Sequence, residues 1–305
     1  MQILSDFLKA NEIITKATKL QKDFVFKTRL QVLDQIIGTT RQGNPYLILP
    51  MRDSTSELRN IKKWINEGEQ LESLRENFDV GSIFELVGKY EKRFNSITIT
   101  SARKLSASEF DLSDFVKLPY IDEKRLIEKF FETISKIKNN YLRLLLENLF
   151  KEKEIREKFF ECPASITIHH PYKCGNLEHC IGMITVFENF ESFYNKNSNL
   201  DTDLIYTGII LHDIGKIYEY SIYNGIPRSE TEYAMLGHLV LGDQLISKFI
   251  NGIEDFPKDL ENRIRHIILS HHGRKEWGSP VEPQFPEAEI IHYLDMIDSR
   301  FKSSP

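Results

Sequence analysis

The sequence has no apolar segment long enough to cross a membrane, and it has only three cysteines among 305 residues. A membrane-spanning helix needs about 20 consecutive apolar residues, and no run in this chain approaches that length. The amino terminus also lacks the basic start and apolar stretch of a secretory signal. Cys162, Cys174 and Cys180 cannot all pair with one another, and their spacing fits neither a zinc finger nor a disulfide framework. We therefore expect a soluble cytoplasmic protein with reduced thiols.

Histidine is absent from the first half of the chain, since all nine histidines fall from His169 onward. Charge is also unevenly placed within a net charge of −5. Residues 1–161 carry 28 basic and 25 acidic side chains, whereas the remaining residues carry 12 and 20. The acidic, histidine-rich second part is therefore suited to binding cations. The first part can accept a polyanion, although ordinary solvated surfaces vary by as much.

Short β-prone runs separated by turn residues fill residues 23–105, after a helical lead over residues 4–20. Residues 24–30 alternate in part, and a turn over residues 41–45 leads into 46–49, so that these segments predict a hairpin. We expect three more strands at residues 56–61, 82–90 and 96–101, and one helix at residues 67–78. Five short strands with a helix after the third predict a small all-β barrel of the OB type, with a plain β-sandwich as the alternative.

The pattern becomes helical from residue 112 onward, with apolar residues at helical spacing. We expect a helical stretch over residues 112–161, broken at Asn139 and Asn140. Further helices are expected at residues 176–194, 203–211, 234–250, 258–270 and 287–301. The chain should thus be multidomain, with an OB-type domain, a helical connector packed on the last domain, and an all-α domain, at residues 1–105, 106–168 and 169–305.

A histidine and a carboxylate stand side by side at the end of an apolar run, in the segment IILHDIGK at residues 209–216. Burying the imidazole of His212 and the carboxylate of Asp213 without partners costs on the order of several kcal/mol. A metal ion would neutralise them, and Lys216, one turn later, would then suit an anionic substrate. The alternative is a buried hydrogen bond between His212 and Asp213, with an exposed lysine.

Other histidines fall on the apolar faces of expected helices. This holds for His179, His238 and His271, and Asp295 lies on the apolar side of the last helix. A lone histidine on such a face is usually a satisfied core residue, but here the pattern recurs on several helices. Imidazole and carboxylate ligands without thiolate suit manganese, iron, cobalt, nickel or zinc. With Asp213 as a bridge they offer two sites, whose formal surplus of about +2 favours a phosphoester substrate and a metal-activated water.

The motifs around these residues resemble the HD superfamily of metal-dependent phosphohydrolases and, more narrowly, the YhaM family of 3′-to-5′ exoribonucleases. The resemblance rests on HDIGK, HHPY, LEH, LGH, LSHHG, GSP and PEA at residues 212–216, 169–172, 177–179, 236–238, 269–273, 278–280 and 286–288. The family's Gly-Gly-Leu-Leu is Cys-Gly-Asn-Leu at residues 174–177, which bears on substrate preference more than on hydrolysis. The resemblance implies an OB-fold ahead of an HD domain and degradation of single-stranded RNA from the 3′ end, with single-stranded DNA as a further candidate.

The resemblance also implies roles for individual residues. One metal site is expected to consist of His179, His212, Asp213 and Asp295. The second is expected to consist of His238 and His271, which His272 can replace or supplement. Catalytic roles are implied for Asp213 and Lys216, and substrate contacts for His169, His170, Lys216 and His272. Two divalent ions are implied, with manganese expected ahead of iron, cobalt, nickel and zinc.

The N-terminal module offers a surface for single-stranded nucleic acid, because an OB barrel stacks bases on aromatic side chains beside a basic groove. The candidates are Tyr90, Lys92, Arg93 and Phe94, although each aromatic residue has a place in the core as its alternative. Two other functions stay open. One is an HD phosphohydrolase of nucleotides, small cyclic nucleotides or dinucleotides, and the other is a nucleic-acid-binding regulator with a vestigial HD site. No membrane partner is expected, and the sequence leaves homo-oligomerisation open.

Overall fold

The structure is a computed structural model of the chain that describes residues 7–66, 68–116, 119–166, 168–194 and 199–301. It divides into two compact units. One consists of residues 1–117 with residues 223–226, and the other of residues 118–222 with residues 227–305. Each unit has its own buried apolar core, and each is described by itself.

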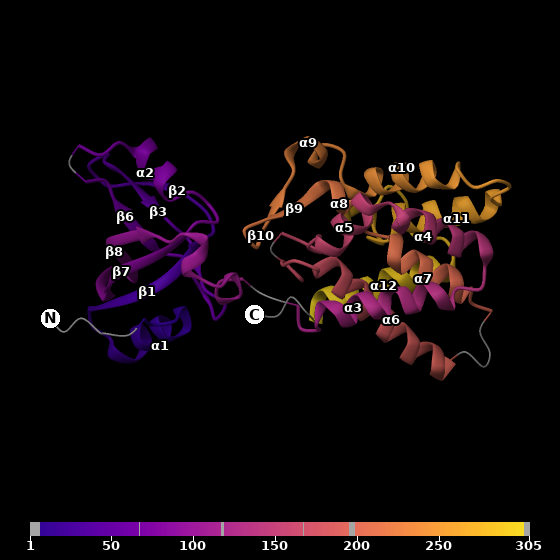
Figure 1. The fold of residues 1–305 in the computed structure, drawn as a ribbon, viewed down its shortest axis with the longest axis horizontal. Helices are drawn as coiled ribbons and strands as arrows, with labels where there is room; N and C mark the ends of the chain where they lie inside the picture. Colours follow the sequence, from indigo (N-terminus) through magenta and orange to yellow (C-terminus); the bar gives the residue numbers. More distant parts are fainter. Residues whose placement is uncertain (1–6, 67, 117–118, 167, 195–198, 302–305) are drawn as a thin grey trace. The chain divides into compact units, whose positions relative to one another are not determined.

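A curled eight-stranded sheet forms the described part of the N-terminal unit (Figure 1). Its strands are β1 (Phe24–Val32), β2 (Ile36–Thr39), β3 (Pro45–Ile48), β4 (Met51–Arg52), β5 (Glu57–Leu58), β6 (Ile61–Trp64), β7 (Ile83–Glu91) and β8 (Ser96–Lys104). Their order in space is β2-β3-β6-β8-β7-β1-β4-β5. The unit also contains helices α1 (Ala10–Leu20) and α2 (Leu71–Asn77).

The curl of the sheet follows from the course of residues 45–52. The first half of this segment, β3, pairs with β6, while the second half, β4, pairs with β1. Between these two pairings the sheet runs through β8 and β7, so one continuous segment pairs with both ends of the four-strand row β6-β8-β7-β1. β6 and β8 pair in parallel, and β7 pairs antiparallel with both β8 and β1. This half-barrel is consistent with the OB type that the sequence predicts.

The predicted hairpin between residues 24–30 and 46–49 is wrong. β3 pairs instead with β2, a strand that the sequence pattern did not reveal. Its Ile36 and Ile37 are exposed, so β2 lacks the alternation that marks a half-buried strand. Within β2, a Cβ atom on Gly38 would lie 2.5 Å from the ring of Tyr46, so only glycine allows this ring to cover the strand. The predicted helical lead over 4–20 is observed as α1 from Ala10, and residues 4–6 lie outside the described part.

Helices dominate the C-terminal unit. They are α3 (Glu123–Lys136), α4 (Asn140–Lys151), α5 (Lys153–Glu161), α6 (Gly175–Tyr194), α7 (Thr202–Leu211), α8 (Lys216–Glu219), α9 (Thr231–Ala234), α10 (His238–Ile250), α11 (Lys258–Ser270) and α12 (Pro286–Phe301). A short hairpin of β9 (Tyr220–Tyr223) and β10 (Ile226–Ser229) follows α8 and was not predicted. None of the described helices has the length and apolar character needed to cross a membrane.

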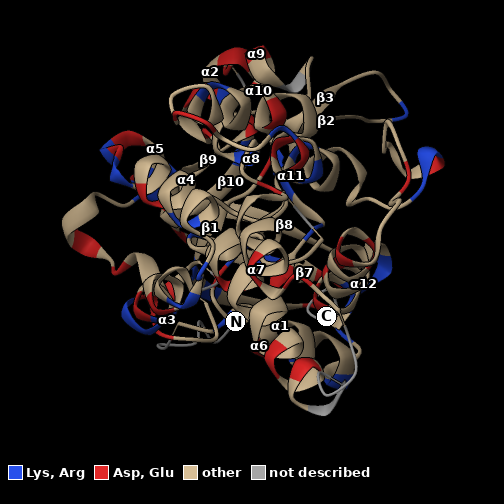
Figure 2. Ribbon diagram, turned by 90° about the vertical axis from the view of Figure 1, so that its right-hand side faces the viewer, with Lys and Arg blue, Asp and Glu red and all other residues tan. Residues whose placement is uncertain are grey.

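α7 is the central helix of this unit, since every residue from Leu204 to Leu211 is buried. It contacts α6, α11 and α12, and also α3 and α4, whose apolar residues share its core. The outer sides of α3 and α5 carry both signs of charge (Figure 2), with ion pairs one turn apart such as Lys158 with Glu154 at 2.8 Å. Because α7 is buried on all sides, the residues that follow Leu211 lie in the middle of the helical bundle.

Side chains at the helix ends explain where the predicted helices break. Asn139 caps α4 by accepting hydrogen bonds from the N–H groups of Tyr141 and Leu142, as expected from the break in the pattern. The helix predicted over residues 234–250 begins only at His238, as α10, because Gly237 adopts a φ of +75° and separates it from the short helix α9. That break makes His238 the first residue of α10, so its backbone and ring both lie at a helix start.

Candidate metal centre

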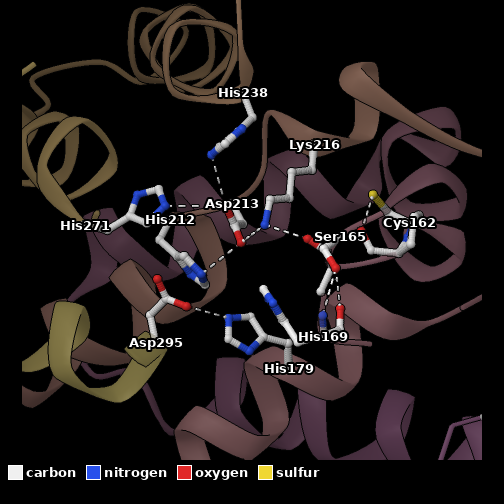
Figure 3. A network of polar contacts seen from close by, with 12 residues as sticks. Cys162, Ser165, His169, His179, His212, Asp213, Lys216, His238, His271 and Asp295 are labelled. Carbon is white, nitrogen blue, oxygen red and sulfur yellow. Dashed lines mark hydrogen bonds and ion pairs between the residues drawn. The ribbon is translucent and has the colours of Figure 1, made fainter. Parts of the chain in front are cut away.

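Five helices bring histidine and aspartate side chains to one place in the C-terminal unit (Figure 3). His179 lies in the first half of α6, His212 and Asp213 directly follow α7, and His271 directly follows α11. His238 opens α10 and Asp295 lies on α12. His179, His212 and His271 are buried to 1% exposure or less, and Asp213 to 3%. The residues that the sequence predicts for the two metal sites are thus assembled in one cluster.

Hydrogen bonds fix the orientation of each ring. In every case Nδ1 lies within hydrogen-bond distance of an oxygen atom, so in the neutral ring Nδ1 carries the hydrogen and Nε2 carries a lone pair. The partners and distances are Asp298 Oδ2 for His179 (2.8 Å), Ile209 O for His212 (2.8 Å), Glu219 Oε2 for His238 (2.8 Å), Ile268 O for His271 (2.9 Å) and Trp277 O for His272 (3.1 Å). Such an outer hydrogen bond is typical of histidines that bind metal through Nε2.

The Nε2 atoms face other electron-rich atoms. Nε2 of His179 lies 3.3 Å from Asp295 Oδ1, and Nε2 of His212 lies 3.2 Å from Asp213 Oδ2. Nε2 of His271 lies 3.4 Å from Asp213 Oδ1. Buried lone pairs that face carboxylates are unfavourable unless a proton or a cation lies between them. Three of these atoms have no hydrogen-bond partner among the described residues, namely Nε2 of His179, Nε2 of His212 and Oδ1 of Asp213. Buried polar atoms without partners are typical of metal ligands in the absence of the ion.

A second group of histidines lies on the other side of Asp213. Nε2 of His238 and Nε2 of His272 are 3.2 Å apart, and His238 Nε2 is 3.6 Å from Asp213 Oδ1. Ligand atoms lie within 4.8 Å of one another in several triplets of residues, namely His238–His271–His272, His179–His212–Asp213, His212–His271–Asp295, His169–His179–Asp295 and His170–His179–Asp298. The donor set therefore fits divalent metal ions, which is the cofactor class that the geometry supports.

Asp213 joins the two groups, and Lys216 neutralises it. Lys216 Nζ donates to Asp213 Oδ2 at 2.5 Å and to Ala164 O at 2.7 Å. Burial alone would raise the pKa of Asp213, but Lys216 and His212 outweigh it and hold that pKa well below its usual range. Burial likewise opposes the charge on Lys216, yet Asp213 raises the pKa of the ammonium. Both groups are therefore charged, and the carboxylate is ready to bind a cation at neutral pH.

The histidines differ in their affinity for protons. Burial acts to lower the pKa of His179, but Asp295 and Asp298 outweigh it and raise the pKa to about 9. Burial lowers the pKa of His271 to about 3, despite its contact with Asp213. A cation at His179 must therefore displace a proton that the two aspartates hold, whereas His271 already offers its lone pair.

The predicted substrate contacts have different surroundings. His169 lines a pocket beside the metal ligands, and its two ring nitrogens have no hydrogen-bond partner among the described residues. His170 is only 1% exposed, with Nε2 3.6 Å from Asp298 Oδ2. This burial argues against a direct substrate contact for His170, because a packed ring cannot reach a bound phosphate. Its positive φ of 45° instead marks the sharp bend before α6.

Four residues of this site were not predicted from the sequence. Asp298 and Glu219 orient His179 and His238, and Trp277 and His292 line the pocket together with Lys216, His271 and Asp295. The spacing of Asp298, three residues after Asp295 on the same helix, was a usable signal. Nothing in the sequence marks Glu219, which reaches its partner only because α8 packs beside the start of α10.

The residues of the N-terminal unit that the sequence predicts to bind nucleic acid differ in their exposure. Tyr90 is 8% exposed, its ring lies 5.2 Å from that of Phe24, and its hydroxyl donates to Asn95, so it is a core residue and not a stacking platform. Phe94 is 58% exposed, with Arg93 and Lys62 over its ring at 5.5 Å and 5.9 Å. Lys92 donates its backbone N–H to Asp23 and is otherwise exposed.

An aromatic pair lies on β3 and β6, and the sequence analysis missed its second member, Trp64. Tyr46 and Trp64 face each other across the two strands, with ring centroids 4.6 Å apart, and Trp64 is 40% exposed. Lys62, two residues before Trp64, places its ammonium 5.8 Å from the Tyr46 ring. Lys62 therefore lies within reach of both Tyr46 and Phe94. We call Tyr46, Trp64, Phe94 and Lys62 the β3–β6 surface.

The buried cluster of histidines and aspartates within an all-helical bundle defines a metal-dependent domain of the HD class. The HD domain family matches residues 176–300, which hold all the clustered residues except His169 and His170. The chain is also 30% identical over 276 residues to the 3′-5′ exoribonuclease YhaM of Oceanobacillus iheyensis, covering 89% of this chain and 83% of that protein. The chain therefore belongs to the YhaM family.

One solved structure, the crystal structure of yeast Stn1 and Ten1, matches 46% of this chain and 92% of the compared chain. The identity is 14% and the TM-score is 0.23. That similarity is too low to carry an argument about fold or function.

Proposed function

We propose that this protein is a metal-dependent 3′-to-5′ exoribonuclease that hydrolyses single-stranded RNA, with single-stranded DNA as a second substrate. The observation that carries the proposal is the arrangement of buried Nε2 atoms around Asp213, each ring oriented by a hydrogen bond at Nδ1. Membership of the YhaM family supports RNA as the substrate. We propose manganese as the preferred ion, because imidazole-rich sites suit manganese better than magnesium.

The distances around Asp213 support an assignment of ligands to two ions. One ion would be held by His179, His212, Asp213 and Asp295. The second would be held by Asp213 with His238, His271 and His272. Oδ1 of Asp213 faces His238 and His271, while Oδ2 faces His212, so its two oxygens can serve different ions. The short distance between His238 and His272 favours both as ligands of the second ion.

The reaction is the hydrolysis of the last phosphodiester bond of the strand. Ions at these sites would lower the pKa of a water molecule and stabilise negative charge on the phosphoryl oxygens. The water oxygen forms a bond to phosphorus, the bond from phosphorus to the 3′ oxygen of the preceding nucleotide breaks, and that oxygen takes up a proton. The products are a nucleoside 5′-monophosphate and a strand shortened by one nucleotide, with a free 3′ hydroxyl.

Two residues of the chain have defined parts in this step. Lys216 uses two of its three N–H donors on Asp213 and Ala164, which leaves the third for a phosphoryl oxygen. His169 lines the pocket, and its ring nitrogens have no hydrogen-bond partner in the described part of the chain, so it can bind a phosphoryl oxygen or add to the first metal site. Lys216 thus has two effects, since it holds the bridging carboxylate in place and adds positive charge beside the phosphate.

We also propose a division of labour along the chain. Residues 1–105 would bind the polymer, residues 106–168 would connect and brace the helical domain, and residues 169–305 would carry the chemistry. The β3–β6 surface supports the first assignment, because it combines exposed aromatic faces with a lysine, as stacking surfaces for single strands do. The apolar faces of α3 and α4 support the second, since they belong to the core of the C-terminal unit.

The test is incubation of the purified protein with manganese and single-stranded RNA labelled at its 5′ end. The proposal expects a ladder of products that shorten by one nucleotide from the 3′ end, with nucleoside 5′-monophosphates accumulating in step. The same RNA bearing a 3′-terminal phosphate is the control, because a block at that end separates attack at the end from internal cleavage. Internal fragments, or no product with any divalent ion, would refute the exonuclease assignment.

A further inference from the structure

The pocket beside the candidate metal centre has an apolar side as well as a metal-binding side. It has a volume of about 450 Å³, near the lower end of the range for small-ligand sites. Asp213, His271 and Asp295 lie in its wall, and so do Trp277 and Ile168. Trp277 is 46% exposed and Ile168 is 68% exposed, although the pocket lies next to some of the most buried residues of the chain. Large apolar side chains in such a place are available to a ligand.

Trp277 is held in a defined position relative to the histidines. Its backbone carbonyl accepts the hydrogen bond from Nδ1 of His272 at 3.1 Å, so the tryptophan is bonded directly to a candidate metal ligand. The turn that carries it is closed by the N–H of Trp277 donating to Arg274 O, and Gly278 follows with a φ of +95°. These hydrogen bonds therefore hold the backbone that carries the indole in one position beside the histidines.

The other neighbours of the indole are polar rings and a cation. The guanidinium of Arg274 lies 4.9 Å from the Trp277 ring centroid, and the His292 ring lies 6.0 Å away at 36°. His292 is itself fixed, because its Nδ1 is 2.8 Å from His271 O and a Cβ on Gly273 would lie 2.2 Å from its ring. A planar aromatic ring with a cation nearby is what binds a nucleobase and its phosphate together.

From this placement we propose that Trp277 forms a stacking subsite for the base of the 3′-terminal nucleotide, beside the metal centre. The inference rests on the proposed function and deepens it. A base that stacks on Trp277 puts its own 5′ phosphate towards Asp213 and Lys216, which lie in the same pocket. Every base has an aromatic face, so the subsite accepts all four nucleotides but requires a terminal base that is free of pairing.

The first arm of the test uses fluorescence and needs no catalysis. The sequence has two tryptophans, so Trp64→Phe leaves Trp277 as the single emitter, and Trp277→Phe leaves Trp64. Adenosine 5′-monophosphate is titrated into each protein with manganese present, and ribose 5-phosphate serves as the ligand without a base. We expect saturable quenching of Trp277 by the nucleotide and none by the sugar phosphate. Unchanged Trp277 emission with saturating nucleotide would overturn the proposal, whether or not the protein degrades RNA.

The second arm compares two short RNA substrates, one ordinary and one whose 3′-terminal nucleotide lacks its base. We expect Trp277→Ala to lower kcat/KM for the ordinary substrate by about ten- to a hundredfold, the range of base stacking, and to leave the abasic substrate unchanged. Trp277→Phe should retain most of the activity. Tyr293→Ala is the matched control, because this α12 ring is 57% exposed and lies outside the lining of the described pocket.

The outcomes separate this subsite from the proposed function. If Trp277→Ala slows both substrates equally, the indole acts only by packing against the pocket wall and not on the base, because the backbone carbonyl that holds His272 is kept in this variant. The stacking proposal is then wrong while the nuclease stands. If the wild-type protein cleaves neither RNA, the proposed function fails. The fluorescence arm then decides alone whether the pocket is a nucleotide subsite.

Discussion

Lys216 Nζ lies 2.5 Å from Asp213 Oδ2, so a buried ammonium stands directly against the carboxylate that joins the two histidine groups. Asp213 is 3% exposed and Lys216 is 7% exposed. Removing either partner leaves the other charge buried, which typically costs about 3–5 kcal/mol. The pair therefore couples the stability of the helical unit to its candidate chemistry, and variants of either residue must be compared with the double variant.

Asp213→Asn should lower kcat on single-stranded RNA by about a hundredfold or more, because the metals lose the carboxylate between them. The same change should lower the free energy of unfolding by about 3 kcal/mol, because Lys216 loses its partner. Urea unfolding, bound metal and turnover are measured together. Asp213→Asn combined with Lys216→Met should recover much of the stability but none of the activity. Turnover at the wild-type level in Asp213→Asn would remove this residue from the mechanism.

Lys216→Met by itself should keep the bound metals and lower kcat, because its ammonium contacts Asp213 and would contact the phosphate but is not a ligand. Metal analysis by mass spectrometry and kinetics with manganese test this together. Loss of both metals in Lys216→Met would show that the lysine maintains the site instead of acting on the substrate.

Tight chelators should abolish activity, and manganese should restore at least about tenfold more of it than magnesium. Chelation should also lower the melting temperature, because ions that bind only the folded chain stabilise it by mass action. RNA hydrolysis assays and scanning calorimetry on the chelated protein, with and without each added ion, measure the activity and the melting temperature. Equal activity with magnesium alone would argue against an imidazole-rich catalytic site.

Glu219→Gln should weaken metal affinity by about 10- to 100-fold, because the carboxylate orients His238 through its Nδ1. Glu219 Oε2 accepts both the backbone N–H of His238, at 3.0 Å, and the ring N–H, at 2.8 Å. Isothermal titration calorimetry with manganese measures the affinity. Glu289→Gln, on the first turn of α12, is a matched control on an exposed glutamate. Identical affinities for the two variants would exclude an orienting role for Glu219.

The metal-free protein should lose stability as the pH rises from about 6.5 towards 9. The pKa of His179 is raised to about 9 by Asp295 and Asp298, so its protonated form stabilises the fold fully below the unfolded pKa of about 6.5. The expected slope is at most about 1.4 kcal/mol per pH unit. Urea unfolding between pH 6.5 and 7.5 stays below the unfolded pKa of about 8.5 at which the three thiols ionise. A metal-loaded sample should lack this slope, because the ion replaces the proton, and an equal slope in both would refute the assignment.

Trp64→Ala should lower kcat/KM for a long single strand by about tenfold and leave a dinucleotide unaffected, because the β3–β6 surface would touch only the longer polymer. Lys62→Glu should do the same and also reduce the salt dependence, since a phosphate contact releases counterions. Tyr90→Phe is the control, because Tyr90 is buried and loses only its hydroxyl bond to Asn95. Equal losses on both substrates would reject the β3–β6 surface as the polymer site.

Local sequence patterns were sufficient to predict most helices and to mark the histidine and aspartate residues that the fold brings together. The helix predicted over residues 258–270 coincides with α11, and those over 176–194 and 203–211 agree with α6 and α7 to within one residue. The spacing of apolar residues indicates which face of a helix is buried, and a histidine or aspartate on that face needs a hydrogen-bond partner or a cation. The sequence motif could therefore single out His212 and Asp213 before any geometry was known.

Tertiary structure alone decided which groups face one another. The pairing of β3 with β2, the burial of Tyr90, and the approach of Glu219 to His238 depend on packing between distant elements, which no local period encodes. The same is true of Trp277, whose place beside the metal centre depends on the turn after α11. The sequence by itself determined which helix positions face a core and carry groups that can bind cations, because helical periodicity and ligand chemistry are properties of residue type and spacing. Only the fold decided their distances, and these distances determine what the cluster can bind.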